Sequence, residues 1–153
     1  MGRADDPARP RGAAGRLPSR WAGAPVGRYF LQASIAAEHA TASRAEDTDW
    51  GRIAVLYDVL AQAAPGAVVE VNRAVAHGRA HGAAAGLAVL DAVDPSRLGA
   101  SPLLPSVRGD LLERAGRHAE AASFFDEAAR VTRNEGERRV LRRRAEDNRT
   151  LGG

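Results

Sequence analysis

The 153-residue chain contains no cysteine and no lysine, and aromatic residues make up only 5% of it. Without cysteine it can form neither disulfides nor thiolate metal sites, which fits a reducing compartment, and we expect a cytoplasmic protein. No run of 18 apolar residues is present, so we predict no membrane-spanning helix. Residues 1–25 lack the apolar centre of a secretory signal.

Motifs of the common enzyme classes are also missing, since no P-loop, GxGxxG or GxSxG occurs. His77 and His81 have the spacing of a helical zinc pair, but no glutamate follows the first histidine and Gly78 is expected to break the helix. Asp47 and Asp49 flank a predicted helix start, where acids complement the helix dipole. We therefore predict no enzyme activity, no catalytic, cofactor or metal site, and no small-molecule substrate.

Charge is distributed unevenly along the chain, whose 22 basic residues are all arginine and whose net charge is +3. Residues 1–30 carry +4, residues 31–129 carry −5 and residues 130–153 carry +4. Abundant Arg, Ala and Gly are typical of a GC-rich coding sequence, so arginine content alone does not indicate phosphate binding. The acidic centre argues against a basic nucleic-acid-binding face on the body of the protein.

Residues 1–27 place four prolines in a Gly/Ala/Arg background, and we predict a disordered basic leader there. Two interpretations remain open, a tail that binds nucleic acid and a solvated leader without a binding role. We favour the second, because six arginines in residues 1–30 are close to the background expected of such a GC-rich genome.

A 35-residue internal period is the most informative pattern of the chain. Small residues recur opposite small ones and large apolar residues opposite large ones: Ala74 with Gly109, Gly86 with Ala121, and Leu90 with Phe125. Periods near 34 residues are the signature of tetratricopeptide-like helical hairpins, which stack because one hairpin cannot bury its apolar face alone. The predicted fold class is therefore all-α, with about three hairpins over residues 28–148 and a C-terminal capping helix.

Apolar residues at helical spacing, with turn residues between them, predict seven helices. Their expected ranges are 29–40, 48–63, 67–77, 83–93, 102–115, 119–132 and 134–148. Thr48 is predicted to cap the second helix, and Asn134 with Glu137 resembles a capping box for the seventh. Residues 149–153 are predicted to be a disordered tail.

Apolar residues are few on the seventh helix, where Val140, Leu141 and Ala145 form its expected packed face. A terminal capping helix should have one side packed against the domain and one side exposed to solvent. Its arginines, Arg138, Arg139, Arg142 and Arg143, could form a stripe that contacts phosphate or nucleic acid. A solvated cap helix is the favoured interpretation, because no aromatic residue lies between the arginines for base stacking.

Six segments complete the pattern: GRYFLQASIAAEHA (27–40), DTDWGRIAVLYDVL (47–60), VVEVNRAVA (68–76), GLAVLDAV (86–93), LLPSVRGDLLERAGR (103–117) and NEGERRVLRRRAE (134–146). In this order they resemble the C-terminal tetratricopeptide-like extension of bacterial extracytoplasmic-function RNA polymerase sigma factors. The resemblance covers about residues 27–148, and LLPSVRGDLLERAGR is its most diagnostic segment. This chain has Ser101–Pro102 where family members usually have an aromatic–His pair, and residues 1–26 match neither sigma core region.

The resemblance implies a regulatory domain that modulates transcription initiation by contacting the sigma core, RNA polymerase or a regulator. We expect no direct DNA binding by this chain, since it shows no helix-turn-helix pattern with a basic recognition helix. An alternative is a free-standing helical-repeat adaptor or scaffold without a role in transcription. From repeat geometry, the expected protein-binding residues lie in a groove of the odd-numbered helices: Asn72, Arg73, His77, Arg108, Asp110 and Leu112.

Overall fold

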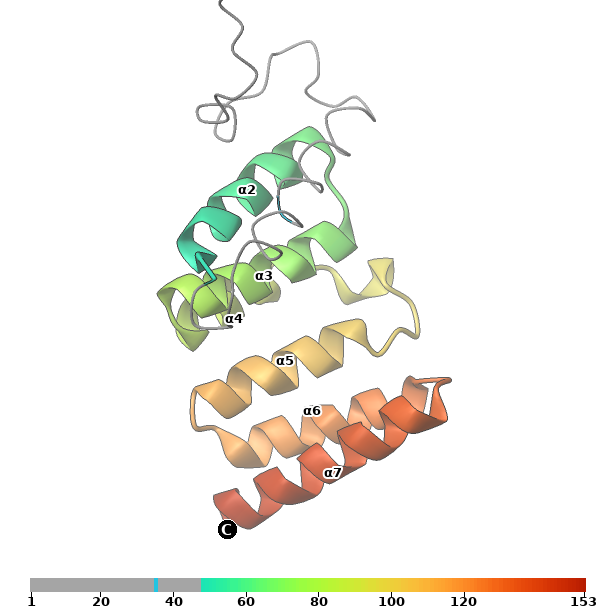
Figure 1. Cartoon of the computed structure of the whole chain (residues 1–153). Coiled ribbons are helices and arrows are strands. Elements are labelled where there is room, and N and C mark those ends of the chain that lie inside the picture. The colour runs from blue at the N-terminus through green and yellow to red at the C-terminus, as the bar shows by residue number, and fades with distance from the viewer. Residues whose placement is uncertain (1–34, 36–47) are drawn as a thin grey trace, which may run out of the picture.

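A computed structural model describes residue 35 and residues 48–153 (Figure 1). This part of the chain is entirely helical, as the hydrophobic pattern predicted. The helices are α2 (Trp50–Ala63), α3 (Ala67–His81), α4 (Ala83–Asp91), the 3-10 helix η4 (Pro95–Arg97), α5 (Leu103–Arg114), α6 (His118–Val131) and α7 (Glu135–Gly152). The predicted leader, 1–27, and first helix, 29–40, lie outside the described residues, apart from Ile35, which is helical and buried.

Sequential packing organises the described helices. The pairs α2–α3, α3–α4, α5–α6 and α6–α7 pack extensively, whereas α4 and α5 share a smaller contact and α5 also contacts α3. Figure 1 shows the resulting row, from α2 at one end to α7 at the other. Short connections between successive helices favour antiparallel neighbours, so this arrangement is consistent with repeated helical hairpins.

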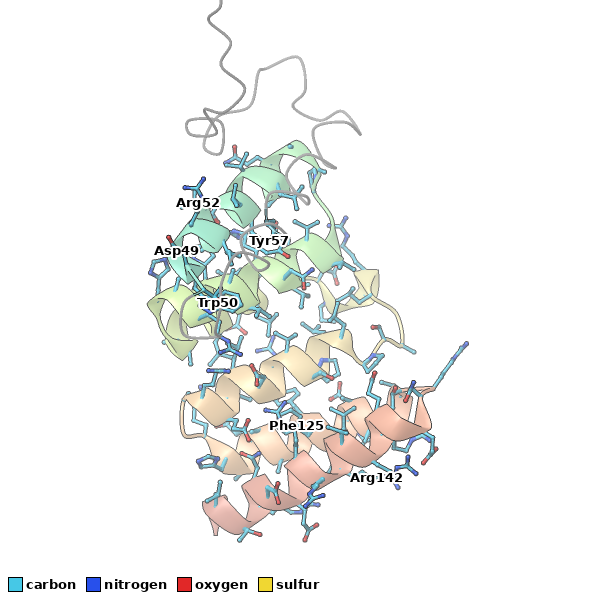
Figure 2. All side chains as sticks on the ribbon, in the orientation of Figure 1. Asp49, Trp50, Arg52, Tyr57, Phe125 and Arg142 are labelled. Atoms are coloured by element: carbon cyan, nitrogen blue, oxygen red, sulfur yellow. The ribbon has the colours of Figure 1, made fainter. Side chains whose placement is uncertain are left out.

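Three apolar clusters form the core. The first joins Ile35 to α2 and α3, the second lies between α3, α4 and α5, and the third between α5, α6 and α7. In the third cluster Phe125 of α6 packs with Leu112 of α5 and Leu141 of α7 (Figure 2). Residues related by the 35-residue period occupy equivalent buried positions, since Leu90 and Phe125 are both fully buried.

Asparagine and aspartate side chains cap the starts of three helices, α2, η4 and α7. Asn134 Oδ1 accepts a hydrogen bond from the Glu137 amide at 2.8 Å, as predicted for α7. The N-cap of α2 is Asp49, whose Oδ1 accepts from the Arg52 amide at 3.0 Å, and not Thr48 as predicted. The carboxylate of Asp49 is three residues from that amide, which is the reach that an N-cap side chain requires.

Gly78 does not end α3, which corrects the predicted boundary at residue 77. The helix continues to His81, and the turn falls at Gly82, whose φ of 103° is the left-handed conformation that glycine adopts without strain. Gly78 is buried, and a Cβ at this position would lie 2.5 Å from Cδ2 of Leu111. Its lack of a side chain therefore serves helix packing rather than a turn.

The end of α7 also differs from the prediction of a disordered tail at 149–153, because the helix extends to Gly152. Tertiary contacts hold its last turn: Arg149 forms an ion pair with Asp126 of α6 at 2.7 Å. Gly152 lies so close to α6 that a Cβ would be 3.0 Å from the amide nitrogen of Ala119. Val140, predicted to be packed, is 59% exposed.

Candidate protein-interaction surfaces

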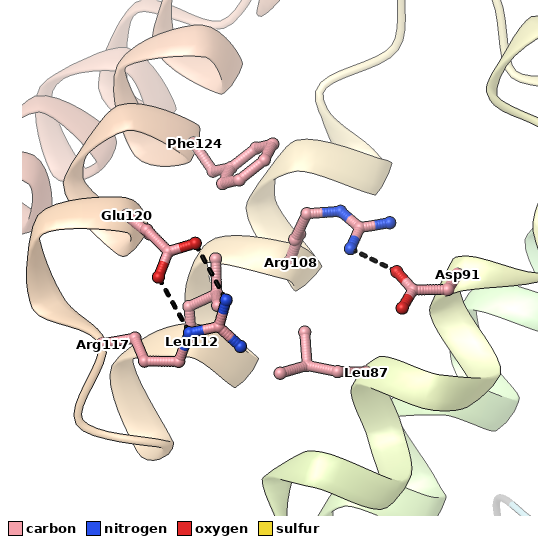
Figure 3. Close-up of a pocket in the computed structure, with 7 residues that line it drawn as sticks. All are labelled: Leu87, Asp91, Arg108, Leu112, Arg117, Glu120 and Phe124. Carbon is pink, nitrogen blue, oxygen red and sulfur yellow. Dashed lines mark hydrogen bonds and ion pairs between the residues drawn. The ribbon is translucent and has the colours of Figure 1, made fainter.

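A concave site in residues 48–153 is the groove between α4, α5 and α6 (Figure 3). Its volume is about 240 Å³. Seven residues line it, Leu87 and Asp91 from α4, Arg108 and Leu112 from α5, and Arg117, Glu120 and Phe124 from the start and middle of α6. The groove thus combines an apolar floor with charged walls.

Two ion pairs form the charged walls of this groove. Arg108 Nη1 donates to Asp91 Oδ1 at 2.7 Å, and the Arg108 guanidinium lies 5.7 Å from the centroid of the Phe124 ring. Arg117 binds both carboxylate oxygens of Glu120, at 2.8 and 2.9 Å. These hydrogen bonds from Arg117 lower the pKa of the Glu120 carboxyl.

The ion pairs on the walls of the groove are exposed to solvent, so the groups of a ligand can replace them. The side chains of Asp91, Arg117 and Glu120 are 67%, 52% and 55% exposed. Exposed ion pairs contribute only about 0–1 kcal/mol to stability, so a ligand with suitable charges can replace them at little cost. Leu87 and Phe124 are half-buried and offer apolar area to such a ligand. The chemistry of the groove suits a peptide side chain with an apolar body and a charged or polar neighbour.

A second polar cluster joins α2 to α3. Arg73 Nε donates to Asp58 Oδ1 at 2.7 Å, and His77 Nε2 lies 2.8 Å from the same oxygen. Arg73 also donates to Glu70 at 3.1 Å. Burial raises the pKa of the Asp58 carboxyl, but the hydrogen bonds from Arg73 and His77 outweigh it, so this pKa lies below its ordinary value.

The groove and the α2–α3 cluster each contain an arginine–aspartate ion pair that recurs with the 35-residue period. Arg73 and Arg108 are 35 positions apart, and each binds an aspartate of the preceding helix at 2.7 Å. Asp58 of α2 and Asp91 of α4 are those aspartates. The repeat therefore reproduces an interhelical ion pair as well as the apolar positions.

The predicted groove residues do not share one surface. Arg108 and Leu112 line the groove described above, whereas Arg73 and His77 belong to the α2–α3 cluster. Asp110 points elsewhere, toward α7, where Arg144 donates to it at 3.0 Å. Successive helical residues are 100° apart, so Asp110 lies 200° around α5 from Arg108.

Two of the six candidate residues have limited access to a ligand. Leu112 is only 3% exposed and belongs to the third core cluster. Asn72 is half-buried on α3, and its side chain forms no hydrogen bond within residues 48–153. Leu112 is therefore less accessible to a partner than Arg108, which, like Asn72, is half-buried.

The Arg138 side chain makes structural contacts with the end of α6 and is not part of an exposed arginine stripe. Its Nε donates to the carbonyl oxygen of Ala129 at 3.0 Å, and its other nitrogens reach the Thr132 carbonyl oxygen and Glu135. Carbonyl groups at a helix end have no partner within the helix, and Arg138 satisfies two of them at the end of α6. The remaining predicted arginines, Arg139, Arg142 and Arg143, are exposed.

A polar junction between α5, α6 and α7 was not predicted from the sequence. Asn148 is fully buried, and its Oδ1 lies 2.7 Å from His118 Nδ1. Its Nδ2 donates to Glu113 Oε2 at 2.8 Å and to the Arg144 carbonyl oxygen at 2.9 Å. Residues 141, 145 and 148 follow the spacing of one helix face, a signal that could have placed Asn148 inside.

Arg144 strengthens this junction from the same helix. It binds Asp110 and Glu113 of α5, and its guanidinium lies 4.3 Å from the centroid of the Phe125 ring. Burial lowers the pKa of this guanidinium, but the two carboxylates outweigh that effect and leave the pKa above its ordinary value.

Neither a membrane segment nor a metal centre emerges from residues 48–153. None of their helices combines the length and apolarity needed to cross a bilayer. No three metal-binding side chains of this region come close enough together to hold an ion. His77 and His81 do lie on one continuous helix, with ring centroids 5.5 Å apart, because Gly78 does not interrupt α3.

Comparison with known proteins identifies a relative but no family. No family model matches the chain. It is 40% identical over 116 residues to an uncharacterized protein of Rhizobium meliloti (strain 1021). The matched region covers 76% of this chain and 27% of that protein, so the chain is similar to one part of a longer relative.

Proposed function

We propose that this chain is the C-terminal regulatory domain of an extracytoplasmic-function RNA polymerase sigma factor and that it modulates transcription initiation through protein contacts. The groove between α4, α5 and α6 is the observation that carries the proposal. The segment 103–117, the most diagnostic part of the sigma-factor resemblance, forms α5 and the turn that follows it. That segment contributes Arg108, Leu112 and Arg117 to the groove.

Binding in this proposal uses the mixed chemistry of the groove. An apolar side chain of the partner packs on Leu87 and Phe124, and polar groups of the partner replace the exposed wall pairs. Arg108 stays paired with Asp91 or exchanges to a carboxylate of the partner, and its fork geometry suits either. The partner is the sigma core, RNA polymerase or a regulator, and the contact takes place in the cytoplasm, where transcription occurs.

The first test concerns the genetic context of the chain. The DNA upstream of the Met1 codon is sequenced and translated in all three frames. A sigma core in any of these frames supports the proposal. Unrelated sequence upstream contradicts it and favours the alternative, a free-standing helical-repeat adaptor or scaffold.

The second test concerns the groove itself. Binding of the chain to the sigma core found upstream, and to core RNA polymerase, is measured by biolayer interferometry. Phe124→Ala and Arg108→Ala should each weaken binding roughly tenfold, which is 1.4 kcal/mol. Arg97→Ala, in the exposed helix η4 outside the groove, is the matched control and should leave binding unchanged. If all three variants bind the partner as tightly as the natural chain does, the groove is not the partner-binding site.

A further inference from the structure

Arginines of the described region fall into two groups. Arg73, Arg108, Arg114 and Arg117 of the central helices all bind carboxylates. On α7, the same is true of Arg138, Arg144 and Arg149. By contrast, Arg139, Arg142 and Arg143 are exposed and form no ion pair within residues 48–153, which is also true of Arg79, Arg97, Arg130 and Arg133. Arg139, Arg142 and Arg143 differ from these four because they lie within two turns of one helix.

These three arginines occupy the side of α7 that faces away from the core. Residues three and four apart are neighbours on a helix, so Arg139 lies beside both Arg142 and Arg143. The packed side carries Leu141, Ala145 and Asn148. Figure 2 shows Arg142 on the side of α7 that is remote from α5.

Three of the four carboxylates of α7 have partners other than Arg139, Arg142 and Arg143, whereas the exposed Asp147, four residues after Arg143, offsets part of their positive charge. Glu135 pairs with Arg138, Glu137 accepts from the Thr132 hydroxyl, and Glu146 pairs with Arg149. Val140, which is 59% exposed, lies three residues before Arg143 and borders this face beside it, but it lies 200° around α7 from Arg142. The outer face of α7, defined as Arg139, Arg142 and Arg143 with Val140 at its edge, is thus basic with an apolar border.

We propose that the outer face of α7 binds a short, acidic, amphipathic peptide segment of a partner protein. Carboxylates of that segment accept hydrogen bonds from the three guanidinium groups, and an apolar side chain packs on Val140. Guanidinium and carboxylate groups match in planar geometry and form charge-assisted hydrogen bonds. The inference stands apart from the proposed function, because it requires neither the groove nor a sigma core.

Size and surroundings favour a peptide over a nucleic acid. Residues 139–143 span about 6 Å along the helix axis, which matches about one turn of a partner helix. Glu135 and Glu137 precede the basic face and Glu146 and Asp147 follow it, so a long polyanion would meet negative charge at both ends. Helix α7 also carries no aromatic side chain on which bases could stack.

The experiment measures binding of a fluorescein-labelled peptide of about 14 residues, or four helical turns, in which Glu residues confined to the central turns lie beside a Leu on the same face. Fluorescence anisotropy is recorded with the full chain, and circular dichroism checks the fold of every variant. A peptide of the same composition in scrambled order and a short DNA duplex are the comparison probes. We expect the amphipathic peptide to bind more tightly than either of them.

Charge reversal of the whole face, R139E/R142E/R143E, should weaken peptide binding roughly tenfold or more, because three exposed charge pairs are lost. Val140→Ser should weaken it about threefold through the lost apolar contact. Single variants Arg143→Glu and Arg97→Glu change the charge equally at two exposed sites, and only the first should reduce binding.

Three results overturn the inference. The first is absence of peptide binding, and the second is unchanged binding by the folded triple variant. The third is a DNA duplex that binds more tightly than the peptide, with a log–log salt slope of about −3, as the release of three counterions requires. A further combined result is equal binding of the ordered and scrambled peptides with no effect of Val140→Ser. This combined result would show that the peptide need not be amphipathic, and it overturns the proposed contact with Val140.

Discussion

The hairpins α3–α4 and α5–α6 are built on the same 35-residue period but fill their cores differently. In α3–α4, Ala74 and Leu90 share the second core cluster. In α5–α6 the corresponding residues are Gly109 and Phe125, and a Cβ at position 109 would lie 2.8 Å from Cε1 of Phe125. A larger residue on one helix is thus matched by a smaller one on its neighbour, so the repeat preserves the space between helices rather than residue identity.

Their tightest contacts also lie at different places. In α3–α4 the backbones approach at Gly78 and Gly86, where Leu111 also packs. The corresponding residues of α5–α6 are Glu113 and Ala121, and Glu113 binds Arg144 and Asn148 of α7. One hairpin is therefore held by close backbone packing, and the other by side chains that reach a capping helix.

Gly86→Ala should cause the largest loss of stability. The added Cβ would lie 2.8 Å from the Ala74 carbonyl oxygen and 2.9 Å from the Gly78 Cα, and no side-chain rotation relieves contacts with backbone. We expect a loss of about 3 kcal/mol in the free energy of unfolding, measured in urea. As a control, Gly51→Ala meets its nearest atom at 3.5 Å and should stabilise α2 by up to about 1 kcal/mol. Equal effects at both glycines would contradict the close-packing account.

Gly109→Ala tests whether the two hairpins use interchangeable pairs. Alone it should cost about 1–3 kcal/mol through contact with the Phe125 ring. Phe125→Leu alone should cost less than the roughly 3–5 kcal/mol of a Phe→Ala change. Together they recreate the Ala74–Leu90 pair, and we expect the double variant to be more stable than the sum of the single losses predicts. Strict additivity in thermal and urea unfolding would show that the two positions are independent.

Asn148→Leu should destabilise the polar junction by about 1–3 kcal/mol, because Glu113 and His118 each lose a buried partner. Loss of protection in α7, measured by hydrogen exchange, should exceed that in α3. The neighbouring variant Asp147→Ala, at an exposed position, provides the comparison and should have little effect. A uniform loss of protection would mean that α7 unfolds together with the whole domain.

The smallest expected change in stability comes from the Asp58 carboxyl, whose pKa is lowered in the folded chain. A lowered folded pKa stabilises the protein above the unfolded pKa of about 3.9, and this contribution disappears as pH falls through the folded value. Because the Asp58 side chain is 40% exposed, we expect less than about 1 kcal/mol. Asp58→Asn should therefore be less stable than the natural chain near neutral pH. The difference in urea unfolding should shrink in acid, and a constant difference would contradict this assignment.

Local patterns accounted for most of the helices. The end of α2 at Ala63 followed from apolar spacing and Pro65, and α6 and α7 began within a residue of their expected positions. In the groove, Arg108 and Leu112 were predicted, whereas Asp91 and Phe124 were not. The latter two lie on other helices, and their approach to Arg108 depends on how α4, α5 and α6 pack, which helical periodicity does not specify.

By itself, the amino-acid sequence determined the all-helical character of the described region, the approximate helix ranges and the equivalence of positions 35 residues apart. These depend on local propensity, caps and periodicity, which act over a few residues. Tertiary structure alone decided that Gly78 is a helix-packing residue, that Asn148 is buried and that α7 extends to Gly152. It also separated Arg144, which binds α5, from the adjacent Arg143, which faces solvent. Adjacent helical residues differ by 100° in direction, so the neighbouring helices, and not the residue type, determine the role of each arginine.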